Sequence, residues 1–227
     1  MAISKQSVSF LTHLSKNNNK DWFTENKPEY ISAHENMVDF ADEVLTLLNE
    51  IDKIETPTGK KALKRIYRDV RFSKNKTPYK NNFGLSFSRQ GASRRGGFYV
   101  HIQPNASFIG GGFWSPEKED LQRIRKHVEV DDSELRKILS SKDFQSTFGT
   151  MTGEQLKTAP KGFDKEHSAI DLLRYKQFLI GREFTDTEVL TANFATKVAE
   201  TLEAMLPFFN VMTEMLTTNL NGESLID

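Results

Sequence analysis

A long helical stripe near the N-terminus is the sequence feature that most restricts the fold. Between Tyr30 and Ile51, mostly apolar side chains recur at alternating steps of four and three residues, the spacing of one helix face laid on a core. Pro28 stands in the expected first turn, where a helix tolerates proline. His34 is expected to be packed and hydrogen-bonded within the stripe. The stripe consists of Tyr30, His34, Met37, Ala41, Val44, Leu48 and Ile51.

A second amphipathic helix is predicted in the C-terminal part of the chain, from about Thr187. Its apolar positions follow a helical period, and Pro207 is expected to interrupt the helix before it resumes. These positions are Leu190, Phe194, Val198, Leu202, Met205, Val211, Met215 and Leu216. Another helix is expected to start at Ser115-Pro116-Glu117, which has the pattern of an N-cap, a first-turn proline and an early acid.

Short segments between these helices carry the alternation typical of strands. Residues 83–88, 97–103 and 107–114 are separated by turn residues, and three consecutive strands with tight connections predict an antiparallel meander. Residues 177–184 are predicted to form a last strand, and the composition of residues 65–72 favours a strand over the alternative helix. The expected fold class is α+β, with a mostly antiparallel sheet of about four to six strands packed against long N- and C-terminal helices.

The composition is that of one globular domain without cysteine chemistry. The chain contains no low-complexity stretch or long linker, so residues 1–227 are expected to form a single domain. The absence of cysteine excludes disulfides, thiolate metal sites and a cysteine nucleophile. No signal-peptide core and no membrane-spanning apolar run occurs, so a cytoplasmic protein without a membrane partner is expected.

Residues 60–80 carry the strongest charge asymmetry in the sequence. The chain has 31 basic and 31 acidic residues, yet this stretch places nine bases beside a single acid, Asp69. Tyr67, Phe72 and Tyr79 lie between the cations, and this mixture of charge and aromatic surface is suited to an anion site. The cations are Lys60, Lys61, Lys64, Arg65, Arg68, Arg71, Lys74, Lys76 and Lys80.

A motif within this stretch resembles a known family signature. The segment R-I-Y-R-D-V-R-F-S-K-N-K-T-P-Y is similar to the pattern R-x-x-R-D-x-R-F, followed by a lysine and a tyrosine, of the bacterial family called domain of unknown function 2461. The similarity covers the whole chain, and it implies no activity. The matched positions are Arg65, Arg68, Asp69, Arg71, Phe72, Lys76 and Tyr79.

Three interpretations of the motif remain open. In the first, it lines a pocket, catalytic or merely binding, for a small anionic ligand that bears phosphate or carboxylate. The pocket residues would be Arg65, Arg68, Asp69, Arg71, Lys76 and Tyr79. In the second, the basic stretch 60–95 is a surface patch for nucleic acid or an acidic partner. That patch would add Lys74, Lys80, Arg89, Arg94 and Arg95. In the third, Asp69 bridges the arginines in an internal ion network, and the function lies elsewhere.

Asp69, Tyr79 and His101 are candidate acid or base residues. His101 alternates with Tyr99 and Gln103 on a predicted strand, where it can form part of a pocket wall. The histidines show no spacing typical of zinc ligands, so neither a metal nor a cofactor is expected. The three glycines 110–112 match no Walker or dinucleotide motif and predict a bulged strand end instead.

Overall fold

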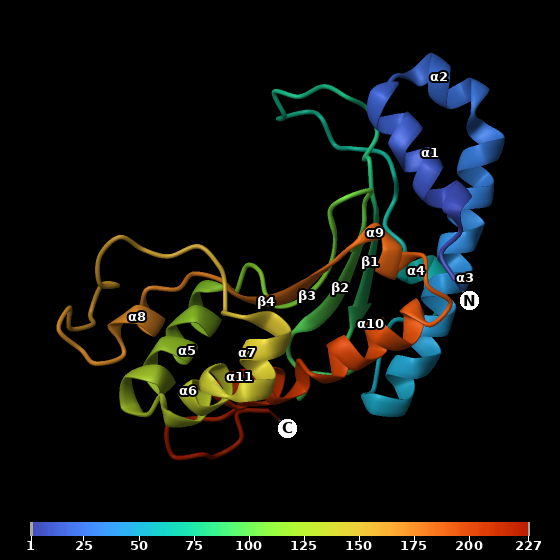
Figure 1. Cartoon of the computed structure of the whole chain (residues 1–227). Helices are drawn as coiled ribbons and strands as arrows, with labels where there is room; N and C mark the ends of the chain where they lie inside the picture. Colours follow the sequence, from blue (N-terminus) through green and yellow to red (C-terminus); the bar gives the residue numbers. More distant parts are fainter. Residues whose placement is uncertain (1, 227) are drawn as a thin grey trace. The chain divides into compact units, whose positions relative to one another are not determined.

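The protein has an α+β fold built on one four-stranded antiparallel sheet. The computed structural model describes residues 2–226. The strand order is β1-β2-β3-β4, so the expected meander and the expected last strand are both present (Figure 1). The strands are β1 (Phe83–Ser88), β2 (Gly97–Ile102), β3 (Ser107–Phe113) and β4 (Phe178–Phe184). The predicted fold class is confirmed, with the sheet at the lower limit of the expected number of strands.

The helices precede, interrupt and follow these strands along the chain. Before the sheet come α1 (Lys5–Lys16), α2 (Lys20–Glu25), α3 (Lys27–Ile51) and α4 (Gly59–Ala62). Between β3 and β4 lie α5 (Lys118–Val130), α6 (Ser133–Ser140), α7 (Lys142–Phe148) and α8 (Ile170–Leu173). After β4 come α9 (Asp186–Val189), α10 (Phe194–Glu203) and α11 (Leu206–Thr217).

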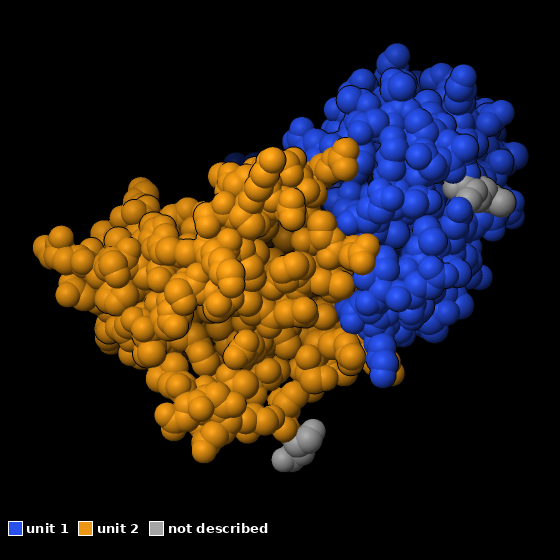
Figure 2. Space-filling view, turned by 60° about the horizontal axis from the view of Figure 1, so that its bottom comes forward, with its two compact units in different colours: residues 1–88, 99–109, 183–201 blue, residues 89–98, 110–182, 202–227 orange. Residues whose placement is uncertain are grey.

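Contacts divide the chain into two compact units, each of which the backbone enters more than once. Unit 1 comprises residues 1–88, 99–109 and 183–201. Unit 2 comprises residues 89–98, 110–182 and 202–227, and Figure 2 distinguishes the two units by colour. Strands β2, β3 and β4 each contribute residues to both units. The single domain expected from the sequence therefore stays a prediction.

Helix α3 forms the core of unit 1, as its stripe predicts. The side chains on its inner face are fully buried, and α1 and α4 pack along it. Phe40 of α3 stacks on Phe194, with ring centroids 5.7 Å apart. His34 lies at the edge of the stripe, half-buried against the ring of Tyr30. The fully buried stripe positions are Met37, Ala41, Val44 and Leu48.

Helix α11 is the centre of unit 2. Phe208, Phe209 and Met212 are fully buried, and α5 and α6 pack against the helix. The ring of Phe209 also contacts Phe98, with 5.1 Å between the centroids. Pro207 lies in the first turn of α11, where its missing N–H costs no helical hydrogen bond. The proline thus marks the start of α11 and separates it from α10.

Two predicted helix boundaries are wrong. Helix α5 begins at Lys118, and its N-cap is Glu117 without a side-chain capping bond, so Ser115 does not cap it. The helix expected from Thr187 is divided, because α9 is a short turn before α10 begins. A capping box between Thr185 and Glu188 holds the start of α9.

None of the helices formed by residues 2–226 is long and apolar enough to cross a membrane.

Gly112 is predicted to be essential to the folding of β3. Its backbone has a φ of +131°, and an added Cβ atom would lie 2.1 Å from the carbonyl oxygen of Phe178. Replacing Gly112 with alanine should therefore lower the free energy of unfolding by about 3 kcal/mol or more in urea denaturation. Gly91 is the matched control, since it also has positive φ but open space around it. Its alanine variant should lose on the order of 1 kcal/mol, and equal losses would contradict the steric explanation.

Candidate anion-binding site

Residues 64–80, here called the basic arm, connect α4 to β1 as an irregular loop (Figure 1). The strand predicted for residues 65–72 is wrong. Backbone pairing between the two legs of the arm is limited to an isolated bridge between Tyr67 and Tyr79, with hydrogen bonds on either side of it. Pro78 explains this limit, because it has no N–H to extend a ladder. The arm thus follows the path of a hairpin, but its two legs are not paired into a β-ladder.

The base of the arm is fixed to the helices of unit 1 through Tyr79. The side-chain amide of Asn18 donates to the carbonyl oxygen of Tyr79 at 2.9 Å and accepts from its N–H at 3.1 Å. The buried Tyr79 ring stacks on Phe23, with 3.9 Å between centroids. Ile66 on the opposite leg is also buried. These contacts give the arm a fixed attachment.

Cations within the arm hold its loop in shape. The guanidinium of Arg68 donates to the carbonyl oxygen of Thr77 at 3.2 Å and to the Thr77 hydroxyl. The same group lies 3.5 Å from the hydroxyl of Ser73. The ammonium of Lys76 donates to the carbonyl oxygen of Val70 at 2.9 Å. Arg68 and Lys76 therefore satisfy backbone carbonyls that a strand partner would otherwise bind.

Asp69 forms an exposed ion pair with Arg71 and not an internal network. The Arg71 guanidinium donates to both carboxylate oxygens, with a shortest distance of 2.6 Å. The Asp69 side chain is 44% exposed and the Arg71 side chain is 77% exposed. The hydrogen bonds from Arg71 lower the pKa of the Asp69 carboxyl below its usual range. The interpretation of the motif as a buried ion network around Asp69 is wrong.

A polar cleft of about 430 Å³ runs beside the arm and is here called the arm cleft. Its lining includes two cations, Arg68 and Lys80, and no carboxylate. Burial lowers the pKa of the Lys80 ammonium, and the positive charges of Arg65 and Lys64 lower it further. The site therefore carries uncompensated positive charge. The lining residues are Ser15, Asn18, Arg68, Asn75, Thr77, Tyr79, Lys80, Asn81 and Asn82.

The structure brings together two of the six predicted pocket residues, Arg68 and Tyr79. The other four, Arg65, Asp69, Arg71 and Lys76, are exposed on the arm outside the cleft lining. The asparagines of the lining, Asn18, Asn75, Asn81 and Asn82, were not among the predicted pocket residues. The amides of Asn81 and Asn82 follow the motif directly, and their position next to Lys80 was an available signal.

His101 belongs to a separate polar row on β2. Its Nδ1 lies 3.0 Å from the Tyr99 hydroxyl, and its Nε2 lies 3.2 Å from the amide oxygen of Gln103. Because the amide oxygen only accepts, Nε2 carries the proton and Nδ1 accepts from Tyr99. Burial lowers the pKa of the imidazole, and the charge of Lys80 acts in the same direction. His101 is therefore neutral at pH 7, with its ring stacked on Phe108.

The expected basic surface over residues 60–95 is not formed as predicted. Arg89 is buried in unit 2, where its guanidinium lies over the ring of Phe209 and donates to the carbonyl oxygen of Arg95 at 3.0 Å. The Arg95 side chain forms an ion pair with Asp120. These two arginines are engaged inside unit 2 and do not provide a free basic patch.

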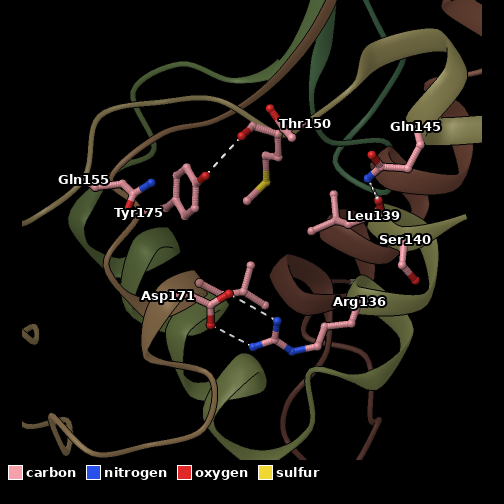
Figure 3. A pocket seen from close by; sticks show the side chains of 10 residues that line it. Arg136, Leu139, Ser140, Gln145, Thr150, Gln155, Asp171 and Tyr175 are labelled. Atoms are coloured by element: carbon pink, nitrogen blue, oxygen red, sulfur yellow. Dashed lines mark hydrogen bonds and ion pairs between the residues drawn. The ribbon is translucent and has the colours of Figure 1, made fainter.

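A second cavity, of about 500 Å³, lies in unit 2 (Figure 3). Figure 3 shows the Arg136 guanidinium facing the Asp171 carboxylate at its rim, with 2.8 Å between the paired atoms. Asp132 binds the same guanidinium at 2.5 Å. Because two carboxylates compensate one arginine, this cavity has no surplus positive charge to attract an anion. Its other walls include Leu139 and Tyr175.

Within residues 2–226, no group of three or more His, Asp or Glu side chains is placed to hold a metal ion.

The fold and the cleft together define an α+β protein with a basic arm and an adjoining polar cleft. The chain belongs to the family described as Conserved hypothetical protein (DUF2461), whose model matches residues 6–210. This match confirms the resemblance seen in the arginine motif. No curated protein matches the chain in sequence. The family description states no activity.

Asn18 is predicted to be the residue that holds the arm. Replacing it with alanine leaves the N–H and C=O of Tyr79 without their partner, which should lower the free energy of unfolding by about 1–3 kcal/mol. The backbone amides of Arg68 and Lys80 should also exchange faster with deuterium, since they bond across the arm. Asn17→Ala is the control, because that side chain makes one exposed local bond to His13. Equal effects of the two variants would contradict this role.

Proposed function

We propose that this protein binds a small anionic ligand, one that carries a phosphate or carboxylate group, in the arm cleft. The observation that supports the proposal is the lining, which contains Arg68 and Lys80 but no carboxylate. Among residues 2–226, Asp69 is the one acid within ion-pair distance of an arm cation, and its partner is the exposed Arg71. An anion in the cleft would compensate the charge that the protein itself leaves uncompensated.

The donors around the cleft suit an anion in their chemistry. Arg68 has a planar fork whose direction is set by Thr77, and Lys80 is an ammonium that can turn towards a ligand. The amides of Asn81 and Asn82 add further donors. The volume of about 430 Å³ lies within the range of small-molecule sites.

Lys80 is predicted to be required for phosphate binding. Inorganic phosphate at roughly ten times its Kd should raise the Tm of the wild-type protein by on the order of 3 °C, because the ligand binds the folded state alone. Phosphate also stabilises proteins non-specifically, so the informative quantity is the difference between variants at equal phosphate concentration. Lys80→Gln should lose the specific part of the shift. The control is Lys61→Gln, an exposed position on α4 outside the lining, and it should keep the full shift.

The affinity for phosphate is predicted to fall at alkaline pH. The folded-state pKa of Lys80 lies below 10.5, so the ammonium loses its proton as the pH rises towards that pKa. Above about pH 8 the charge of phosphate itself is constant, which isolates the contribution of the protein. Isothermal titration calorimetry between about pH 8 and pH 10 should show weakening in the wild type and little change in Lys80→Arg, whose guanidinium stays charged over this range. The same decline in both proteins would remove the support for Lys80 as the titrating group.

A further inference from the structure

The tip of the basic arm exposes an aromatic ring completely. Phe72 is 96% exposed, whereas the other phenylalanines are buried except Phe108, which is 36% exposed. Tyr67, on the same arm, is 52% exposed. Tyr67 packs against the rings of Phe23 and Tyr79 and stays half-exposed, whereas Phe72 covers no part of the core, so stability does not explain the position of Phe72. The arm thus offers two aromatic surfaces to a partner.

Positive charge surrounds these rings. The seven cations of residues 64–80, set against Asp69, give the arm a net charge of +6 (seven minus one). Asp69 is already bound to Arg71, whose guanidinium lies 5.9 Å from the centre of the Phe72 ring. Five of the cations are exposed along the arm: Lys64, Arg65, Arg71, Lys74 and Lys76. A partner of high negative charge would relieve the repulsion among them.

The arm presents these groups in a fixed arrangement. The contacts of Tyr79 with Asn18 and Phe23 fix its base, and the bonds from Arg68 to Thr77 close its loop. A partner therefore loses less free energy to the ordering of the arm than it would with a disordered basic tail. A purely solubilising charge run would require neither this internal bonding nor an exposed phenylalanine at its tip.

We propose that the outer surface of the arm binds single-stranded nucleic acid. Unpaired bases stack on Phe72 and Tyr67, while the exposed cations contact the phosphates between them. Single strands are favoured over duplexes because stacking on a side chain requires a base that is free to leave its neighbours. The arm also has no helix to enter a major groove. This surface lies outside the cleft lining, so the inference does not depend on ligand binding in the cleft.

An anionic membrane is the other partner with matching charge, and the arm fits it less well. Insertion into lipid gains free energy in proportion to the apolar area that the bilayer buries. Within the arm, Phe72 is the one strongly exposed apolar side chain, and the second exposed ring, that of Tyr67, carries a hydroxyl. Bases, in contrast, can stack on both rings, because stacking does not require the ring to be free of polar groups.

The decisive experiment compares base-dependent with purely electrostatic binding. Fluorescence polarisation is measured on the full chain with labelled oligothymidine of about 12 nucleotides, with a duplex of equal length and with inorganic polyphosphate as a competitor. The wild type should bind the single strand more tightly than the duplex. The slope of log K against log salt should be roughly −2 to −3, as for three to four phosphate contacts. Phe72→Ala should weaken single-strand binding by about fivefold or more.

Matched variants separate the arm from the rest of the chain. Trp114 is 69% exposed in unit 2, and its alanine variant should bind the oligonucleotide within about twofold of the wild type. Lys74→Gln should flatten the salt slope by about 0.7, whereas Lys157→Gln, also exposed but outside the arm, should not. Lys80→Gln tests the cleft and should leave oligonucleotide binding within about twofold.

Three results would overturn the proposal. The first is no binding of the single strand even at low salt. The second is equal affinity of the wild type and Phe72→Ala for the single strand, or complete displacement of the single strand by polyphosphate at matched charge. Either result would show that binding is purely electrostatic and that base stacking contributes nothing. The third is co-sedimentation with phosphatidylserine vesicles that is lost in Phe72→Ala while the oligonucleotide does not bind, which would identify a membrane surface as the partner. Apart from the half-buried Lys80, the substituted side chains are exposed, and circular dichroism verifies that each variant is folded.

Discussion

The pair of hydrogen bonds between the Asn18 amide and the Tyr79 backbone is the interaction on which the basic arm depends. An amide side chain presents one donor and one acceptor, so it can satisfy one residue of an extended backbone as a neighbouring strand would. The arm needs such a substitute because Pro78 and the mutual repulsion of its cations prevent a longer ladder. With Tyr79 held in place, Lys80 and the asparagines after it line the cleft.

The surplus positive charge of the basic arm acts differently in the cleft and at the tip of the arm. In the cleft, Lys80 is half-buried and its pKa is depressed, so an anion there is attracted across a medium that screens poorly. At the tip, Arg71 and its neighbours stand in water, where salt at physiological concentration screens charges beyond about 8 Å. A small ligand in the cleft and a long polyanion along the tip are therefore compatible with one charge distribution, and their salt dependence distinguishes them.

Periodicity was sufficient to predict α3 and the meander, since burial repeats along α3 and β2 with the period of each element. It failed at residues 65–72, because β propensity reports packing on a pleated surface and Tyr67 and Phe72 have no sheet beneath them. Pairing between Asn18 and Tyr79 spans 61 residues and leaves no local signal. Counting charges also overestimated the basic surface, because the sequence does not reveal that Arg89 is buried over Phe209.

Arg68 belongs to the scaffold and to the cleft at the same time. Some of its donors bind Thr77 and Ser73, so the proposed ligand would meet a guanidinium whose direction is already fixed and which has little rotational freedom left to lose. Lys80 contributes charge without a fixed direction, because an ammonium on a flexible chain can adapt to its partner. The cleft of about 430 Å³ also has room for more than one phosphate group. Under the proposed function, one oriented and one adaptable cation in such a space would hold the anionic end of a larger molecule, and the asparagine amides would contact its neutral part.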